Sequence, residues 1–179
     1  MASKYLIDAN IFFQAKNFWY QFGFCQQFWT WLEDGHSADV LFSIKKVKKE
    51  IADGVASCPV KGWVKHSLDS SFFLDDEKVG KVNLHYASLM DWAAQQQAKQ
   101  VYSYAALATF ANKDKADAYL VAAAKHYDCV IVTAETPTSG TKGVNNIKIP
   151  NAANAVGVQT ITLFQLLSKH AGPAFKFQP

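Results

Sequence analysis

The stretch KYLIDAN at residues 4–10 decides the fold class of this chain. Its apolar run favours a short β-strand that ends on a carboxylate, Asp8, with Asn10 two residues further on. The stretch CVIVTAE at residues 129–135 has the same arrangement and places Glu135 after the apolar run. Continuous apolar strands are typical of a parallel sheet that is covered on both faces. Acids that follow such strands lie at the carboxyl edge of the sheet, where α/β proteins bind their ligands.

The segments around these two strands carry helical patterns. Apolar periodicity predicts helices at about residues 19–32, 43–52, 60–66, 75–98, 104–110 and 115–128. A short helix started by Pro150, a strand at residues 158–162 and a helix at residues 163–170 close the chain. This alternation predicts one α/β domain over residues 1–179, with a central, mostly parallel sheet and helices on both faces.

The composition is that of a globular protein. The 179 residues suit one domain, and 50% of them are hydrophobic. The first residues lack the apolar core of a signal peptide, and no apolar run is long enough to cross a membrane. An odd number of cysteines, three, suggests reduced thiols and a cytoplasmic location. The absence of CxxC and HExxH spacings argues against a zinc site.

The charge pattern restricts how this chain could hold a phosphate group. The formal net charge is +3, and all 18 basic residues are lysines. Without arginine, phosphate contacts must come from lysine ammonium groups, backbone N–H groups or metal ions rather than from a bidentate guanidinium.

Four acids occupy positions that a solvated surface does not explain: Asp8 and Glu135 follow strands, Glu50 borders a buried helical stripe, and Asp117 opens an almost wholly apolar helix. Taken singly, each also fits an ordinary role as a turn acid, an ion-pair partner, a helix-start acid or a loop residue. Taken together, the four would face one crevice, where their charges repel. Hard divalent cations with oxygen ligands compensate such a cluster, and they support phosphodiester hydrolysis.

At these residues the sequence resembles the PIN-domain family of metal-dependent nucleases. The matching pieces are YLIDAN, VKKEI, KADAYLVAAA and VIVTAE, in the family's order and over nearly the whole chain. The ending IKIPNAANAVGVQTITLFQLL resembles that of a bacterial subgroup related to VapC-type toxins.

The resemblance implies a PIN-like three-layer sandwich and a magnesium- or manganese-dependent endoribonuclease, the toxin of a toxin–antitoxin pair. RNA would be the substrate, and products would carry a 5′-phosphate and a 3′-hydroxyl. A cognate antitoxin protein would be a partner, and a homodimer is a further expectation. The implied catalytic and metal-binding set is Asp8, Glu50, Asp117 and Glu135.

The resemblance also assigns supporting roles. Asn10 and Thr133 would orient the ligands or their waters. The fourth acid is more often aspartate in the family, so the longer Glu135 puts a second metal ion in doubt. Asp114, one turn before Asp117, is a helix-start acid in our interpretation, and it could also replace or assist one of the four.

Lysines flank two of these acids. Lys45, Lys46, Lys48 and Lys49 surround Glu50, and Lys113 and Lys115 lie beside Asp117. They would either contact the RNA backbone or form an ordinary solvated helix face. The loop TSGTKGVNN does not have the spacing of a phosphate-binding loop, and we expect it at the rim of the site with Lys142.

The segment at residues 12–31 is rich in aromatic side chains. Their helical spacing favours packing in the core, or at an interface with a second copy or an antitoxin, over stacking on RNA bases. The aromatic residues are Phe12, Phe13, Phe18, Trp19, Phe22, Trp29 and Trp31.

Two other functions remain open at this point. A PIN-like module without catalysis would bind RNA or protein through the same surface, and the intact acid set argues against it. A phosphoryl-accepting signalling domain also places an acid after a strand, but it usually pairs adjacent acids after its first strand, and LIDAN offers only Asp8.

Overall fold

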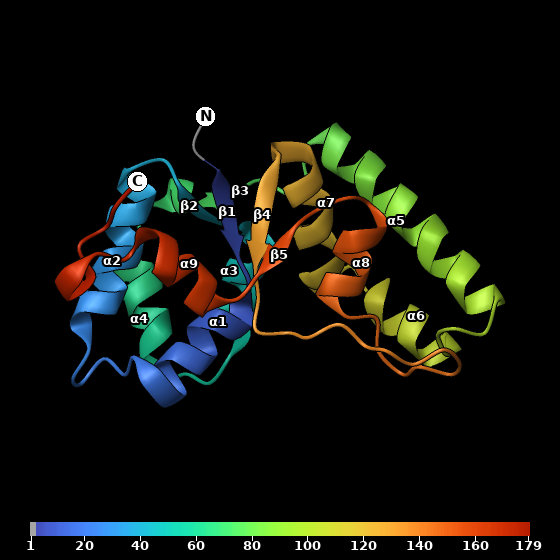
Figure 1. Cartoon of the computed structure of the whole chain (residues 1–179), viewed down its shortest axis with the longest axis horizontal. Helices are drawn as coiled ribbons and strands as arrows, with labels where there is room; N and C mark the ends of the chain where they lie inside the picture. Colours follow the sequence, from blue (N-terminus) through green and yellow to red (C-terminus); the bar gives the residue numbers. More distant parts are fainter. Residues whose placement is uncertain (1–2) are drawn as a thin grey trace.

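Residues 3–179, which this computed structural model describes, contain one five-stranded parallel sheet (Figure 1). The strands are β1 (Lys4–Ile7), β2 (Leu41–Ile44), β3 (Phe73–Leu74), β4 (Cys129–Val132) and β5 (Thr160–Ile161). Their order across the sheet is β3-β2-β1-β4-β5, and every pair is parallel. The carboxyl ends of all these strands therefore meet at one edge, the lower one in Figure 1.

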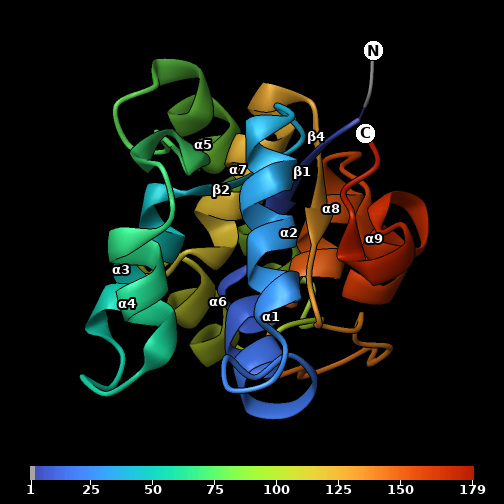
Figure 2. The ribbon, with the colours of Figure 1, turned by 90° about the vertical axis from the view of Figure 1, so that its left-hand side faces the viewer.

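Helices cover the sheet on both faces and make it the middle layer of a three-layer α/β sandwich. α1, α2, α4 and α9 lie on one side, and α5, α6, α7 and α8 lie on the other (Figure 1). After a 90° turn, α2 stands in front of the strands and α7 behind them (Figure 2). The predicted fold class is confirmed. The described chain contains α1 (Ala9–Gln14), α2 (Gln26–Ser37), α3 (Lys45–Asp53), α4 (Pro59–His66), α5 (Gly80–Ala98), α6 (Tyr104–Phe110), α7 (Asp117–Tyr127), α8 (Ile149–Ala155) and α9 (Leu163–His170).

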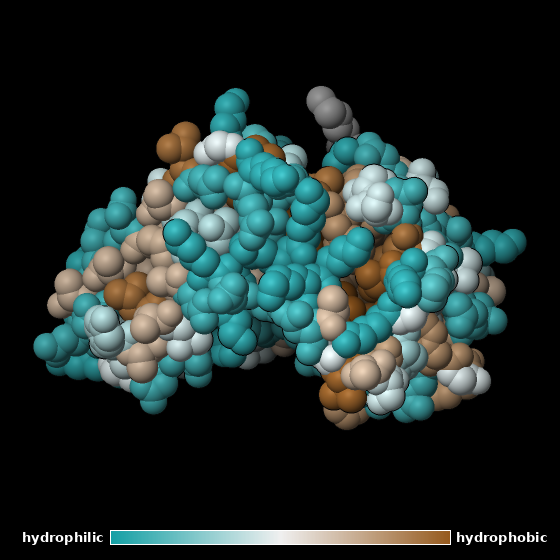
Figure 3. All heavy atoms as spheres, turned by 180° about the vertical axis from the view of Figure 1, so that it is seen from behind, coloured by the Kyte–Doolittle hydropathy of each residue, from teal (hydrophilic) through white to brown (hydrophobic). Residues whose placement is uncertain are grey.

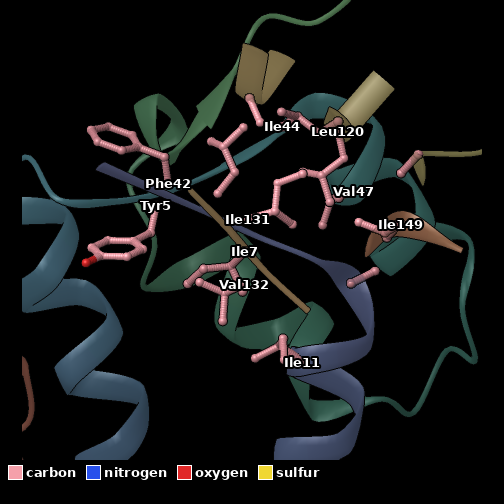
Figure 4. Close-up of a cluster of buried hydrophobic side chains, with 14 of the residues drawn as sticks. Tyr5, Ile7, Ile11, Phe42, Ile44, Val47, Leu120, Ile131, Val132 and Ile149 are labelled. Atoms are coloured by element: carbon pink, nitrogen blue, oxygen red, sulfur yellow. The ribbon is translucent and has the colours of Figure 1, made fainter. Parts of the chain in front are cut away.

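The core is centred on the two middle strands and α7. Ile7 of β1 and Val132 of β4 are opposite each other in the register, and both are fully buried (Figure 4). Residues 118–124 of α7 are buried in succession, because this helix lies between the sheet and α5. The continuous apolar runs that identified these elements thus reflect burial on all sides. None of the helices within residues 3–179 has both the length and the hydrophobicity that crossing a bilayer requires.

The predicted helix at residues 19–32 is wrong in its bounds. A short π-helix (Ala15–Trp19) follows α1, the chain then unwinds, and α2 runs from Gln26 to Ser37. Aromatic side chains stack across this break instead of along one helix. Tyr20 stacks on Phe28 at a ring-centroid distance of 4.3 Å, and Phe22 stacks on Trp29 at 4.0 Å. The i, i+4 spacing was therefore a signal of burial and not of one continuous helix.

Two strands were missed by the sequence analysis. The second half of β2 was assigned to the start of a helix, because its apolar run continues without a turn into α3, which begins at Lys45. β3 is only two residues long and ends before the acids at residues 75–77, which do not open a helix. Asp75 instead accepts backbone hydrogen bonds from Glu77 and Lys78, and α5 begins only at Gly80.

Gly35 lies inside α2, beyond residue 32, where the sequence predicted that the helix ends. A Cβ atom at this position would lie 2.6 Å from Leu41 Cγ and 2.6 Å from Phe177 Cε2. We expect Gly35→Ala to destabilise the fold by about 1–2 kcal/mol, because overpacking of about 1–3 kcal/mol exceeds the helix-propensity gain of about 0.5–1 kcal/mol.

Denaturant unfolding measures this effect, and Gly62→Ala in α4 is the matched control. A Cβ at Gly62 meets nothing within 4 Å, so that variant should gain stability. Equal gains in both variants would contradict the close packing at Gly35.

Candidate functional site

Asp8 lies directly after β1, at the carboxyl edge of the sheet. The register that pairs Ile7 with Val132 continues through a hydrogen bond from Asp8 N to Val132 O, 3.0 Å long. Thr133 Oγ1 then donates to Asp8 Oδ2 at 2.7 Å. The Asp8 side chain is 3% exposed, so the strand holds a buried carboxylate in one fixed orientation.

Thr133 is the centre of a small polar network. Its hydroxyl donates to Asp8 and accepts from Asn10 Nδ2 and from the backbone N–H of Glu135, both at 3.1 Å. Asn10 Oδ1 in turn accepts from Ala134 N at 3.1 Å. Asn10 and Thr133 thus tie the segment after β4 to the segment after β1, and Thr133 orients the Asp8 carboxylate. Their role in orienting metal ligands stays a prediction.

Glu50 reaches the site from α3. Val47 and Ile51 of that helix are buried against the core, and Glu50 is half-buried at the border of their stripe. Its Oε1 accepts from the backbone N–H of Ala116, 2.9 Å away, at the N-terminal end of α7. Glu50 therefore fixes the start of the helix that carries Asp117.

Asp117 is the first residue of α7, and its carboxylate accepts no hydrogen bond from residues 3–179. Burial, reinforced by the charges of Glu135 and Glu50, raises its pKa to about 6 against the attraction of Lys115 and Lys148. The pKa of Asp8 is raised for the same reasons. Burial raises its pKa to about 8, opposed by the Thr133 hydrogen bond and reinforced by the charges of Asp117, Glu135 and Glu50.

Glu135 is held by partners on the far side of the site. Oε1 accepts from Lys148 Nζ at 2.6 Å, and Oε2 accepts from Ile149 N at 2.8 Å, where α8 begins. Lys148 is a site residue that the sequence analysis missed. Its only signal was its place just before the short helix that starts near Pro150.

Two cavities contain the other site residues, and the buried Asp8 lines neither of them. A cleft of about 670 Å³ contains Glu50 and Asp117 together with Lys49, Lys115 and Asp114. A second cavity of about 440 Å³ contains Thr133 and Glu135 and is bordered by Asn151, Asn154 and Gln165. From behind, the molecule narrows between two lobes, and the surface there is mostly hydrophilic (Figure 3).

The sequence-predicted acids thus come together as one charged neighbourhood from β1, α3, α7 and the end of β4. Asp114 lies in the turn before α7, exposed in the same cleft as Asp117, and is not a helix-start acid. All of these groups present oxygen atoms, the donor type that Mg²⁺ and Mn²⁺ prefer.

The acidic side chains have the oxygen donors that a magnesium or manganese ion prefers, but they are not close enough together to form a complete metal site. Within residues 3–179, no group of three or more His, Cys, Asp and Glu side chains is close enough together to hold an ion. Glu50 and Glu135 each accept a hydrogen bond from the backbone at a helix N-terminus. Burial, reinforced by the neighbouring acids, raises the pKa of Asp8 and of Asp117, so these are the carboxylates whose ionised form a cation would stabilise most.

The lysines that flank the acids differ in their exposure and in the groups that they contact. Lys49 and Lys115 border the cleft with Glu50 and Asp117, and Lys113 is exposed nearby. Lys45 is also exposed and pairs with Asp75 Oδ2 at 2.6 Å, and Lys48 lies over the Phe73 ring. Lys142 is exposed in the loop after β4.

The expectation that the lysines around Glu50 all point outward is wrong for Lys46. This side chain is 6% exposed, and its Nζ donates to Glu77 Oε1 at 2.6 Å and to Lys113 O at 2.7 Å. It also lies over the Tyr119 ring. Lys46 therefore ties α3 to the segment before Asp117 and has no free ammonium group for RNA. Its position on the same helical face as Glu50, four residues earlier, was the available signal.

The comparisons with known proteins give one family. The family described as "Domain of unknown function (DUF4411)" matches residues 5–173. No curated protein and no solved structure matches the chain.

Proposed function

The chain belongs to the DUF4411 family, whose function is unknown, and from its own site we propose that it is a metal-dependent endoribonuclease. The proposal is supported by one observation above the others. Carboxylates from four separate segments influence one another at the carboxyl edge of a parallel sheet, and the buried Asp8 has a pKa of about 8 as a result of burial and three acidic neighbours. A stable protein gains nothing from such repulsion, so a bound cation is its natural counterpart.

The chain's own residues would prepare the reaction by positioning. Thr133 holds Asp8, and Asn10 holds Thr133 and the backbone at Ala134. Glu50 fixes the start of α7 and hence Asp117. Lys49 and Lys115 at the cleft would attract the phosphate backbone.

An ion would be held by Asp8 and Asp117, whose ionised forms it would stabilise most, and Glu50 would act indirectly, because no three acids within residues 3–179 are close enough together to hold an ion. Magnesium or manganese lowers the pKa of a water nucleophile and neutralises charge on a phosphodiester. Glu135 has both oxygens engaged by Lys148 and Ile149, which favours an indirect role for it and one ion over two.

We also propose a relation to PIN-domain nucleases and a role as the toxin of a toxin–antitoxin pair, with a cognate antitoxin as partner. This part rests on the resemblance of the four acid-bearing motifs and of the C-terminal segment. A cytoplasmic location is part of the same proposal, and the three free cysteines fit it.

Removal of the metal tests the proposed activity. A 5′-labelled single-stranded RNA incubated with the protein and Mg²⁺ or Mn²⁺ should be cut to products with a 5′-phosphate and a 3′-hydroxyl. With EDTA the cleavage should stop, and added metal should restore it. Cleavage that persists in EDTA would contradict a metal-dependent mechanism.

The second candidate is a module that binds RNA or protein without catalysis. The spacing of the acids favours it, since no group of three is close enough to hold an ion within residues 3–179. Titration calorimetry with Mg²⁺ and Mn²⁺ separates the candidates. Metal affinity that Asp8→Asn removes supports the nuclease, and no affinity together with no cleavage supports the binding module.

A further inference from the structure

Phe18, Trp19 and Phe164 form a continuous aromatic surface, called the aromatic shelf below. Phe18 and Trp19 have ring centroids 6.0 Å apart, and Trp19 and Phe164 meet edge to face at 5.3 Å. The three residues are 63%, 47% and 53% exposed. Adjacent large aromatic side chains left in water mark a binding surface more often than chance exposure does.

The backbone presents the shelf from two elements that are far apart in the sequence. Phe18 and Trp19 end the π-helix Ala15–Trp19, a rare conformation that is frequent at functional sites. Phe164 stands in the first turn of α9, which a capping box between Thr162 and Gln165 holds in place. The shelf is thus built on fixed elements.

The shelf adjoins the carboxylate site. A slot of about 170 Å³ lies beneath it, well under the 300–1,000 Å³ of a drug-sized pocket. The slot is lined by Ile11, Gln14, Trp19, Ala134, Thr162 and Phe164. Ala134 lies between Thr133 and Glu135, and Thr162 also lines the 440 Å³ cavity that contains those two residues. A ligand on the shelf would therefore continue directly to the acids.

The charge around the shelf suits a polyanion. Lys16 stands in the same π-helix as Phe18 and Trp19, and Lys169 stands in α9 with Phe164. Neither element contains an acidic residue. A second copy of the chain would bring the same lysines against these, so the pattern disfavours self-association.

We propose that the aromatic shelf is a base-stacking site for single-stranded RNA, beside the carboxylates that would act on its backbone. The inference rests on the proposed function, because the carboxylates would act on the backbone of the same RNA strand whose base stacks on the shelf. Flat aromatic rings bind any unpaired base through its π-face, and Lys16 and Lys169 on the same two elements would attract the phosphates. A duplex hides those faces in its own stack, so the shelf selects unpaired strands.

The test measures binding in EDTA, where cleavage does not interfere. Trp29, Trp31 and Trp63 are buried, and Trp92 is half-buried, so quenching of Trp19 reports contact at the shelf. A short single-stranded oligoribonucleotide should quench this fluorescence, and the same sequence as a duplex or with an abasic backbone should bind more weakly. Trp19→Ala and Phe164→Ala should each weaken binding of a labelled strand by about 5- to 150-fold.

Tyr104→Ala is the matched control, an exposed aromatic on α6 outside the shelf, and it should bind as the parent does. Thermal unfolding of each variant verifies that it is folded. Equal affinity for the abasic and natural strands, or unchanged affinity in both shelf variants, overturns the proposal. Concentration-dependent dimerisation that Trp19→Ala abolishes, with RNA binding unchanged, assigns the shelf to a second copy instead.

The experiments test the base-stacking site and the proposed nuclease activity independently of each other. Shelf-dependent binding by a protein that never cuts RNA supports the shelf and contradicts the nuclease. Metal-dependent cleavage with full binding in both shelf variants supports the nuclease and contradicts the shelf.

Discussion

Asp8→Asn and Asp117→Asn are each expected to reduce metal-dependent RNA cleavage by at least about 10²-fold, since even residues that only orient metal ligands typically cost 10- to 100-fold. Asparagine keeps the size of the side chain and can accept the Thr133 hydrogen bond, which reaches Asp8 Oδ2 at 2.7 Å. It removes only the charge that would attract a cation. Cleavage rates of a labelled RNA at saturating Mg²⁺ measure the effect.

Asp91→Asn is the matched control for these variants. Asp91 is an exposed acid on α5, outside the two cavities that contain the other site residues. Its replacement removes the same charge from the chain and should leave cleavage unchanged. If Asp8→Asn and Asp117→Asn both cut RNA as fast as Asp91→Asn, the carboxylate site is not the active site.

The stability of the metal-free protein should fall as the pH rises from about 4 to about 8. Burial raises the pKa of Asp8 from 3.8 to about 8 in the folded state, so the folded protein holds a proton there that the unfolded chain has lost. This stability is fully present below pH 4 and is lost as the pH approaches 8. Asp117, whose pKa is about 6, acts in the same direction over the lower part of the range.

The variant Asp8→Asn isolates this effect. At pH 8 without metal it should be more stable than the parent by about 2–4 kcal/mol, less than the full shift implies at 1.36 kcal/mol per pKa unit, because water entry and local relaxation offset part of it. Near pH 4 the two proteins should be equally stable. Added Mg²⁺ should stabilise the parent at pH 8 and leave the variant nearly unchanged.

Urea unfolding over this pH range, for parent and variant in parallel, provides the measurement. The difference between the two curves removes the contribution of other titrating groups. A variant that is less stable than the parent at pH 8 would show that the ionised Asp8 is stabilised by its surroundings, and a cation would then have no repulsion to relieve there.

Several parts of the fold and site were accessible from the sequence. β1, α7 and β4 are buried on all sides, so their apolar runs identify them without knowledge of their neighbours. Because parallel strands end at one edge, the strand pattern alone places Asp8 and Glu135 near each other. The oxygen-donor character of the site followed from the same residues.

Other parts depended on contacts between distant segments. β3 is too short to carry a pattern, and β2 leads directly into α3, so its apolar run looks like the start of that helix. The break before α2 exists because Tyr20 and Phe22 stack on rings within the next helix. Gly35 does not end a helix, because Leu41 and Phe177 fill the space where a side chain would stand. A local pattern reports burial, and it does not report which neighbour provides it.

The sequence by itself determined the α/β class, the identity of the four acids and the two polar residues beside them, because periodicity and residue chemistry are properties of the chain. Only the tertiary structure decided how those acids are used. In the folded protein, Glu50 and Glu135 accept hydrogen bonds at helix N-termini, Lys46 is buried, and Lys148 contacts Glu135. It also leaves Trp19 and Phe164 side by side in solvent. Hydrogen bonds and burial join residues across the whole chain, so their partners appear only when the chain is folded.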